Sequence, residues 1–240
     1  MTGVANLEKK TGKTDTSFPL ISGNLYETID FHAVQRLCKK TQTYKLMTGL
    51  IGDTGLGKST ALNAYRVTHK NVFKVVVDKT MNAKRLYLHI LETLEVKFDG
   101  NIHDVMLKIA ETLNSMDSPL LIVDEAGKMN HVMMLYMHDL REYTKGKCGI
   151  VLSGMPYFRS NLQKFADKGK EGCSEFHRRI NLWHVLGGLS RAEIKYICSE
   201  EGICDDSRIK DLYRFKRFGD LMNELMLDNI ISGEEHHGKV

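Results

Sequence analysis

The sequence predicts an α/β fold in which helices flank a parallel β-sheet and a small helical lid follows at the C-terminal end. Three observations support this. Short apolar runs rich in β-branched residues alternate with stretches of helical spacing over most of the chain. A glycine-rich loop joins the first of these runs to the helical stretch behind it, and from Ser190 onward only helical patterns continue. Because strands that alternate with helices are joined by crossover connections, the sheet is expected to be parallel.

In chain order, the elements divide into an arm, a core and a lid. Residues 1–24 mix Lys, Thr, Ser and Gly without periodicity and are expected to form a flexible N-terminal arm. The core is expected over 25–188, beginning with a helix at 27–40 whose apolar residues recur at helical spacing. The core strands are expected at 45–51, 73–77, 120–123 and 149–153. The lid and a C-terminal tail are expected over 189–240, with helices at 191–200, 206–215 and 219–231.

Composition and charge indicate which partners and environments are compatible with the chain. The chain has 240 residues, 42% of them hydrophobic, and a formal net charge of +4, which permits contact with nucleic acid without requiring it. The five cysteines include no C-x-x-C pair, so we expect reduced thiols and neither a zinc site nor a disulfide framework. No apolar stretch reaches the roughly 18 residues of a membrane span, and the polar start lacks the apolar region of a signal peptide. We therefore expect a cytoplasmic protein with no membrane partner.

A nucleotide-binding motif follows the first expected strand. The run from Gly52 to Thr60, named the P-loop below, fits G-x-x-x-x-G-K-S/T at every fixed position and precedes a helix expected at 59–66. Its glycines let backbone N–H groups face phosphate oxygens. Lys58 is expected to reach the β- and γ-phosphates, Ser59 to ligate Mg²⁺ and Thr60 to help at the α-phosphate. The predicted cofactors are ATP and Mg²⁺, and the predicted cofactor-binding residues are Gly52, Asp53, Thr54, Gly55, Leu56, Gly57, Lys58, Ser59 and Thr60.

The third expected strand leads into two acids, Asp124 and Glu125. Downstream of a P-loop, this pattern indicates that Asp124 holds Mg²⁺ through water, together with Ser59. Glu125 would orient and partly deprotonate the water that attacks the γ-phosphate, which is typical of hydrolysis. The alternative is that the two acids belong to an ordinary helix N-cap region. Ser153, at the polar tip of the next strand, is the candidate that contacts the γ-phosphate.

Two adjacent arginines, Arg178 and Arg179, follow a polar stretch and precede an apolar segment. At such a place an oligomeric ATPase projects an arginine finger into the nucleotide site of the neighbouring subunit. The sequence does not distinguish which of the two is the finger. The alternative is an ordinary exposed pair on a surface helix. Under the finger hypothesis the active unit is a homo-oligomer, either a ring or a filament.

With the P-loop, the acidic strand, the arginine pair and the lid in this order, the sequence resembles AAA+ ATPases. The stretches from Gly52 to Lys70 and from Asn82 to Leu86 are similar to the transposition-regulator branch, which includes MuB of phage Mu, TnsC and TniB, with IstB more distant. The resemblance covers about residues 25–230. It implies a P-loop AAA+ core that assembles ATP-dependent filaments on double-stranded DNA, selects a target and delivers it to a transposase.

The resemblance also implies where DNA is contacted. The DNA-tracking residues of this branch follow the second strand, and by position they fall on Lys84 and Asn101. Independently, the chain between residues 66 and 85 holds one acid, Asp78, and six basic residues: Arg66, Lys70, Lys74, Lys79, Lys84 and Arg85. Unpaired cations there would contact phosphates without reading sequence. The predicted DNA-binding residues are Lys79, Lys84, Arg85 and Asn101; the alternative is an ordinary solvated basic helix.

The lid departs from the family pattern at one position. Met222 stands where many AAA+ lids carry a nucleotide-sensing arginine. The candidates for this role are then Arg214, Lys216 and Arg217.

Three functions are compatible with these features. The first is an ATP-dependent DNA-binding regulator of transposition. The second is a helicase loader, which would share the ATPase core but act through contacts with a helicase. The third, a small-molecule phosphotransferase, is disfavoured by Glu125 and by the lack of a visible acceptor pocket.

Overall fold

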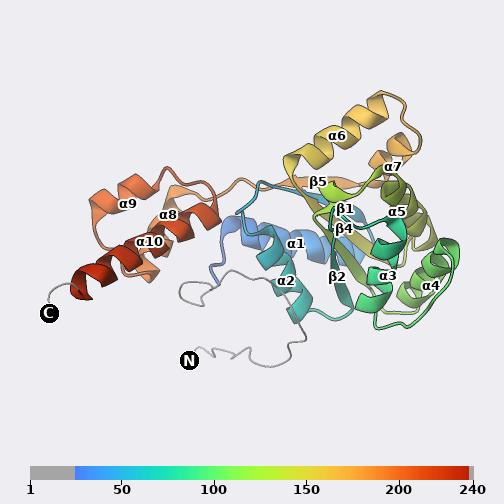
Figure 1. The fold of residues 1–240 in the computed structure, drawn as a ribbon, viewed down its shortest axis with the longest axis horizontal. Helices are drawn as coiled ribbons and strands as arrows, with labels where there is room; N and C mark the ends of the chain where they lie inside the picture. The colour runs from blue at the N-terminus through green and yellow to red at the C-terminus, as the bar shows by residue number, and fades with distance from the viewer. Residues whose placement is uncertain (1–24, 238–240) are drawn as a thin grey trace.

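Among residues 25–237, which the computed structural model describes, five parallel strands form the central sheet (Figure 1). The expected N-terminal arm, 1–24, lies outside the described residues. The strands lie in the order β2-β3-β4-β1-β5, and every adjacent pair is parallel. They are β1 (Met47–Ile51), β2 (Val72–Val76), β3 (Leu120–Asp124), β4 (Gly149–Gly154) and β5 (Leu182–Val185). The predicted α/β class is confirmed, although β5 is not among the expected strands.

Helices cover both faces of the sheet and make a three-layer core. On one face, α1 (Ile29–Tyr44) and α2 (Lys58–Thr68) pack together against the buried residues of the strands. The helices of the other face are α3 (Ala83–Thr93), α4 (Ile102–Asn114), α5 (His131–Tyr143), α6 (Pro156–Asp167) and α7 (Cys173–Arg179). A short 3-10 helix, η1 (Ala126–Lys128), follows β3 directly. Because β1 and β3 are both parallel to β4, the loops that follow them leave the sheet at the same end, where the strands have their carboxyl termini.

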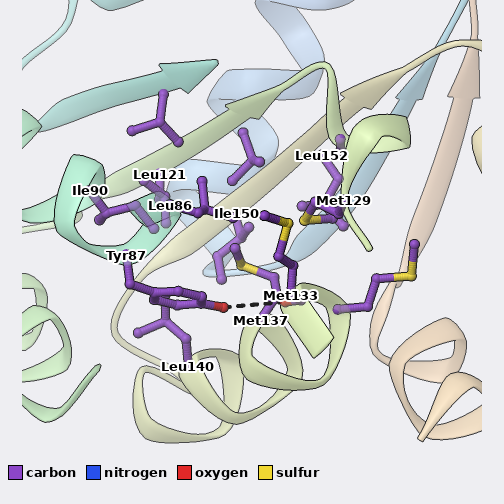
Figure 2. Close-up of a cluster of buried hydrophobic side chains, with 14 of the residues drawn as sticks. Leu86, Tyr87, Ile90, Leu121, Met129, Met133, Met137, Leu140, Ile150 and Leu152 are labelled. Atoms are coloured by element: carbon purple, nitrogen blue, oxygen red, sulfur yellow. Dashed lines mark hydrogen bonds between the residues drawn. The ribbon is translucent and has the colours of Figure 1, made fainter. Parts of the chain in front are cut away.

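The larger apolar cluster lies between the sheet and the helices α3 and α5 (Figure 2). Tyr87 of α3 is fully buried there, and its hydroxyl donates to the carbonyl oxygen of Met133 at 3.4 Å. Burial raises the pKa of this phenol well above its ordinary value. Met129 and Met137 pack into the same cluster, where flexible thioether side chains fill irregular space. This packing fixes β3 and β4, whose carboxyl ends carry predicted site residues.

Within the described residues, three helices form the lid: α8 (Arg191–Glu200), α9 (Asp206–Leu212) and α10 (Phe218–His237). Ser190 starts α8 with a capping box, in which its hydroxyl accepts from the N–H of Glu193 and the Glu193 carboxylate accepts from the N–H of Ser190. The lid has an apolar core of its own, which includes Ile194, Leu212 and Leu221. In Figure 1 the lid lies to one side of the sheet, and its helix α10 begins near the core.

The described residues contain neither disulfides nor a cluster of metal-ligating side chains. Cys204 is exposed and the other four cysteines are buried, and in the described part of the chain all five are free thiols. Residues 25–237 contain no group of three or more His, Cys, Asp or Glu that could hold a metal ion. A helix long and apolar enough to cross a membrane is likewise absent from the described residues.

Candidate functional site

The P-loop connects the end of β1 to the start of α2. Gly55 and Gly57 have positive φ angles of 77° and 80°, a backbone conformation that residues with a side chain adopt only with strain. Gly57 is the N-cap of α2 and, having no side chain, leaves the first N–H groups of the helix uncapped. The N–H of Gly52 donates to the carbonyl oxygen of Gly154 at 3.2 Å, which ties the loop to β4. The loop thus presents uncapped N–H groups at the positive end of a helix, which is an anion-binding arrangement.

Lys58 is the first residue of α2 and is only 7% exposed. Its ammonium donates to the carbonyl oxygens of Gly52 and Asp53 at 2.7 and 2.8 Å. Burial lowers the pKa of Lys58, and the nearby carboxylates of Glu125 and Asp124 act against this lowering. Phosphate oxygens are stronger partners for an ammonium than these neutral carbonyls. The lysine is therefore placed inside the loop where a phosphate can take over its hydrogen bonds.

Asp124 ends β3 beside the P-loop and is 1% exposed. Its Oδ2 accepts from the Ser59 hydroxyl at 2.7 Å and lies 3.1 Å from the ammonium of Lys74, while Oδ1 accepts from the N–H of Glu125 at 3.0 Å. Burial alone would raise the pKa of Asp124, but the Lys74 ammonium and the Ser59 hydrogen bond outweigh it, so the pKa is lowered. An ionised carboxylate joined to a hydroxyl is a pair of hard oxygen ligands, which fits Mg²⁺.

Glu125 follows Asp124 with a positive φ of 57°, a conformation that is uncommon for a residue other than glycine. Glu125 is the N-cap residue of η1, but its side chain makes no capping hydrogen bond. A capping role therefore does not explain a glutamate at this position. Its Oε2 lies 3.6 Å from the Lys128 ammonium, and the side chain is about one third exposed. The carboxylate lines the same pocket as Lys58 and Ser59, a cavity of about 250 Å³.

The lid closes one side of this pocket. Phe218 and Gly219, at the start of α10, contribute to its lining, and the N–H of Gly219 donates to the carbonyl oxygen of Gly55 at 2.8 Å. A methyl group at Gly219 would lie 3.2 Å from the Gly55 Cα, so a glycine permits this close approach. The lid therefore rests directly on the P-loop backbone.

A second, mostly apolar pocket adjoins the first, because Gly57, Thr60 and Phe218 line both. Its other walls come from the chain before α1, from α1 itself, from the P-loop and from α2: Leu25, Tyr26, Thr28, Asp30, Phe31, Val34, Leu56 and Ala61. An apolar hollow beside a phosphate loop suits a flat nucleobase. Of these walls only Leu56 is predicted, as part of the P-loop, because the others come from separate segments without a motif.

Comparison with known proteins identifies the family. The profile of the AAA domain matches residues 41–162, just over half of the chain, and spans the P-loop, Asp124 and Glu125. The chain belongs to the AAA domain family. The match is to the AAA domain as a whole, so the transposition-regulator branch stays a prediction. No curated protein matches the sequence.

Solved structures share the AAA fold at low sequence identity. The replication initiator DnaA, bound to AMPPCP and single-stranded DNA, has a TM-score of 0.58 and 14% identity, over 90% of this chain and 66% of that chain. A DNA replication initiation factor has a TM-score of 0.55 and 15% identity, over 89% and 64%. The ORC1 protein of Aeropyrum pernix, in complex with DNA, has a TM-score of 0.54 and 12% identity, over 73% and 48%. The chain thus spans about half to two thirds of the length of these structures.

Near the P-loop, Ser153 lies at the carboxyl end of β4 and is fully buried. Its hydroxyl is close enough to Asp124 to help lower the pKa of that carboxyl, but the geometry falls short of a full hydrogen bond. In the described structure Ser153 thus faces Asp124. The γ-phosphate contact expected from the sequence is a prediction that this geometry does not test.

The structure distinguishes the two arginines of α7. Arg179 Nε lies 2.5 Å from Glu142 Oε1 of α5, and this ion pair holds α7 against the core of the AAA domain. Arg178 is exposed and forms no ion pair with the described residues. His177, next to it, stacks on Trp183 of β5. Arg178 is therefore the arginine of this pair that is available to a neighbouring molecule.

The predicted DNA-binding residues have unequal environments. Lys79 and Lys84 are exposed and make no ion pair with the described residues. Arg85 is paired with Glu92 of the same helix at 2.8 Å, and Asn101 is the N-cap of α4, where its side chain accepts from the N–H of Asp104. The expectation that Lys74 is one of the unpaired cations is wrong, because its buried side chain forms an ion pair with Asp124.

The residues predicted to take the place of the lid arginine differ in their environments. Met222 is 8% exposed and packs in the apolar core of the lid, so the lid uses this position for packing. Among the candidate replacements, Arg214 pairs with Glu224 at 3.0 Å within the lid. Arg217 instead lies 3.9 Å from a carboxylate oxygen of Asp53 in the P-loop.

Proposed function

We propose that this AAA-domain protein is an ATP-dependent, largely sequence-nonspecific DNA-binding ATPase that oligomerises on double-stranded DNA and delivers target DNA to a transposase. The observation that carries the ATPase part is one pocket lined by Lys58, Ser59 and Glu125, with the carboxylate of Asp124 hydrogen-bonded to Ser59. The branch resemblance and the exposed cations after β2 support the DNA part. DnaA and ORC1, which share the fold, were each solved with DNA.

In the proposed mechanism, the N–H groups of the P-loop and the Lys58 ammonium hold the β- and γ-phosphates. Ser59 and Asp124 would hold Mg²⁺, which when bound neutralises charge on the phosphate oxygens. Glu125, at the open side of the pocket, orients the attacking water and accepts its proton. The apolar hollow beside Tyr26 and Phe31 receives the base. Arg217 contacts the phosphates from the lid, in place of the arginine absent at Met222.

The DNA interface is tested by the salt dependence of binding. Lys84→Ala is expected to weaken binding to all duplex sequences alike and to lower the salt slope by about one per lost phosphate contact, while ATP binding is unchanged. Lys195→Ala, which removes an exposed lysine from the lid, is the control and is expected to keep the wild-type slope. The measurement is fluorescence anisotropy of labelled duplexes at several salt concentrations with an ATP analogue. An unchanged slope in a Lys79/Lys84 double alanine variant would move the DNA interface away from this segment.

The arginine finger is tested by its action on the neighbouring subunit. Arg178→Ala is expected to reduce ATP hydrolysis by at least about 100-fold in the assembled protein, because a finger stabilises charge in the transition state. Arg179→Ala is the matched variant: it removes the ion pair with Glu142 and is expected to cost at most about 1 kcal/mol of stability. Steady-state phosphate release measures the turnover of both variants.

Mixing subunits identifies the finger directly. Arg178→Ala subunits keep an intact pocket, and Lys58→Ala subunits keep an intact finger. A mixture is therefore expected to recover activity that neither variant has alone. Full ATPase activity of assembled Arg178→Ala would show that the finger lies elsewhere.

A further inference from the structure

A buried lysine lies directly behind the proposed metal site. Lys74 is in the middle of β2, and its side chain is 8% exposed. In the β2–β3 register, Lys74 is paired with Ile122, two residues before Asp124, so Lys74, Ile122 and Asp124 share the face of the sheet that α2 covers. The ammonium lies 3.1 Å from Asp124 Oδ2 and donates to Asn63 Oδ1 of α2 at 3.1 Å.

A lysine ammonium that is buried in this way lowers the stability of the fold unless other groups compensate its charge. Burying a lysine removes its hydration, and a buried ion pair often contributes no more than an apolar side chain of similar size. The neighbouring inward position of β2, Val72, is apolar, as is usual for a strand covered by a helix. A charged residue at position 74 is thus an exception that stability alone does not explain.

The charge of Lys74 lies beside the residues proposed to hold the metal. Asp124 Oδ2 is shared by the Lys74 ammonium and the hydroxyl of Ser59, the residue proposed to hold Mg²⁺. Together with Lys58 in the P-loop, Lys74 is a second buried positive charge close to the Ser59–Asp124 pair. Such a charge attracts a triphosphate and repels a divalent cation at the same site.

We propose that Lys74 is a positioning residue that holds the carboxylate of Asp124 and takes over part of the charge neutralisation that Mg²⁺ provides. The consequence is that this protein binds ATP with less dependence on the metal than it would with a neutral residue at position 74. The inference rests on the proposed nucleotide site and extends it.

The test compares ATP binding with and without the metal. Dissociation constants for ATP are measured by isothermal titration calorimetry in excess Mg²⁺ and in EDTA, and their ratio is the readout. In Lys74→Met, the metal-free affinity is expected to fall by about ten-fold relative to wild type, while affinity in Mg²⁺ changes less, so the ratio rises. Lys74→Arg, which restores the charge, is expected to return the ratio toward the wild-type value. Lys97→Met, in the exposed loop after α3, is the matched control.

The outcomes separate an electrostatic role from a structural one. If Lys74→Met loses the same factor of ATP affinity in both buffers, so that the ratio is unchanged, Lys74 has only a packing role and the proposal is overturned. Thermal unfolding checks each variant, and Lys74→Gln, which keeps a polar side chain without charge, takes the place of Lys74→Met if that variant does not fold. Failure of the wild type to bind ATP in either buffer would instead contradict the proposed function itself.

Discussion

Glu125→Gln is expected to bind ATP nearly as well as wild type and to hydrolyse it at least about 100-fold more slowly. A glutamine keeps the size of the side chain but cannot accept a proton from the attacking water, and general-base catalysis contributes roughly this much or more. The phosphate contacts of Lys58 and the Ser59–Asp124 pair are not altered by this change. ATP-bound protein should therefore accumulate and remain on DNA longer. Phosphate release and DNA dissociation rates measure the two effects.

The control for this prediction is an acid of the same type away from the pocket. Glu111 of α4 is exposed and pairs with Lys108, so Glu111→Gln should leave hydrolysis unchanged. If Glu125→Gln hydrolyses ATP at the wild-type rate, Glu125 does not act in hydrolysis. That result would favour the alternative that the acidic pair belongs to an N-cap region.

Lys58→Ala is expected to weaken ATP binding by at least about 100-fold, because the P-loop loses its buried cation and its charge-assisted hydrogen bonds to phosphate. DNA binding should be lost as well, because bound ATP is proposed to stabilise the oligomer that assembles on DNA. Arg66→Ala, at the exposed end of the same helix, is the control and should bind ATP normally. Calorimetry gives the ATP affinity and anisotropy gives the DNA affinity. Undiminished DNA binding by Lys58→Ala would show that nucleotide and DNA binding are not coupled.

The sequence predicts most of the sheet because its central strands are continuous apolar runs, as in β3 and β4, where every residue is buried. It does not predict β5, since Leu182 and Val185 are exposed and the strand is defined by pairing with β1 rather than by its own pattern. The helix expected at 206–215 ends earlier, at Leu212. Its last apolar residues pack in the lid core from a turn, and burial does not require helical structure.

The sequence predicts those parts of the site whose residues are adjacent in the chain. The P-loop carries its own geometry, and the Asp124–Glu125 pair follows an apolar strand, so both are recognised without the fold. Lys74 is misinterpreted because charge counted along the chain does not tell which side of a strand a residue occupies. The pocket beside Tyr26 is missed for a related reason, since its walls meet only after the lid and α1 come together.

The central claim is that ATP binding drives assembly of this protein on DNA. It is tested most directly by measuring the affinity of the wild-type protein for a long duplex with a non-hydrolysable ATP analogue, with ADP and without nucleotide, and by imaging the same samples by electron microscopy. The account predicts tight, salt-sensitive binding and ordered oligomers on DNA with the analogue only. Absence of DNA binding with the analogue would contradict it and favour the helicase-loader alternative, and equal binding in all three conditions would contradict the coupling to ATP.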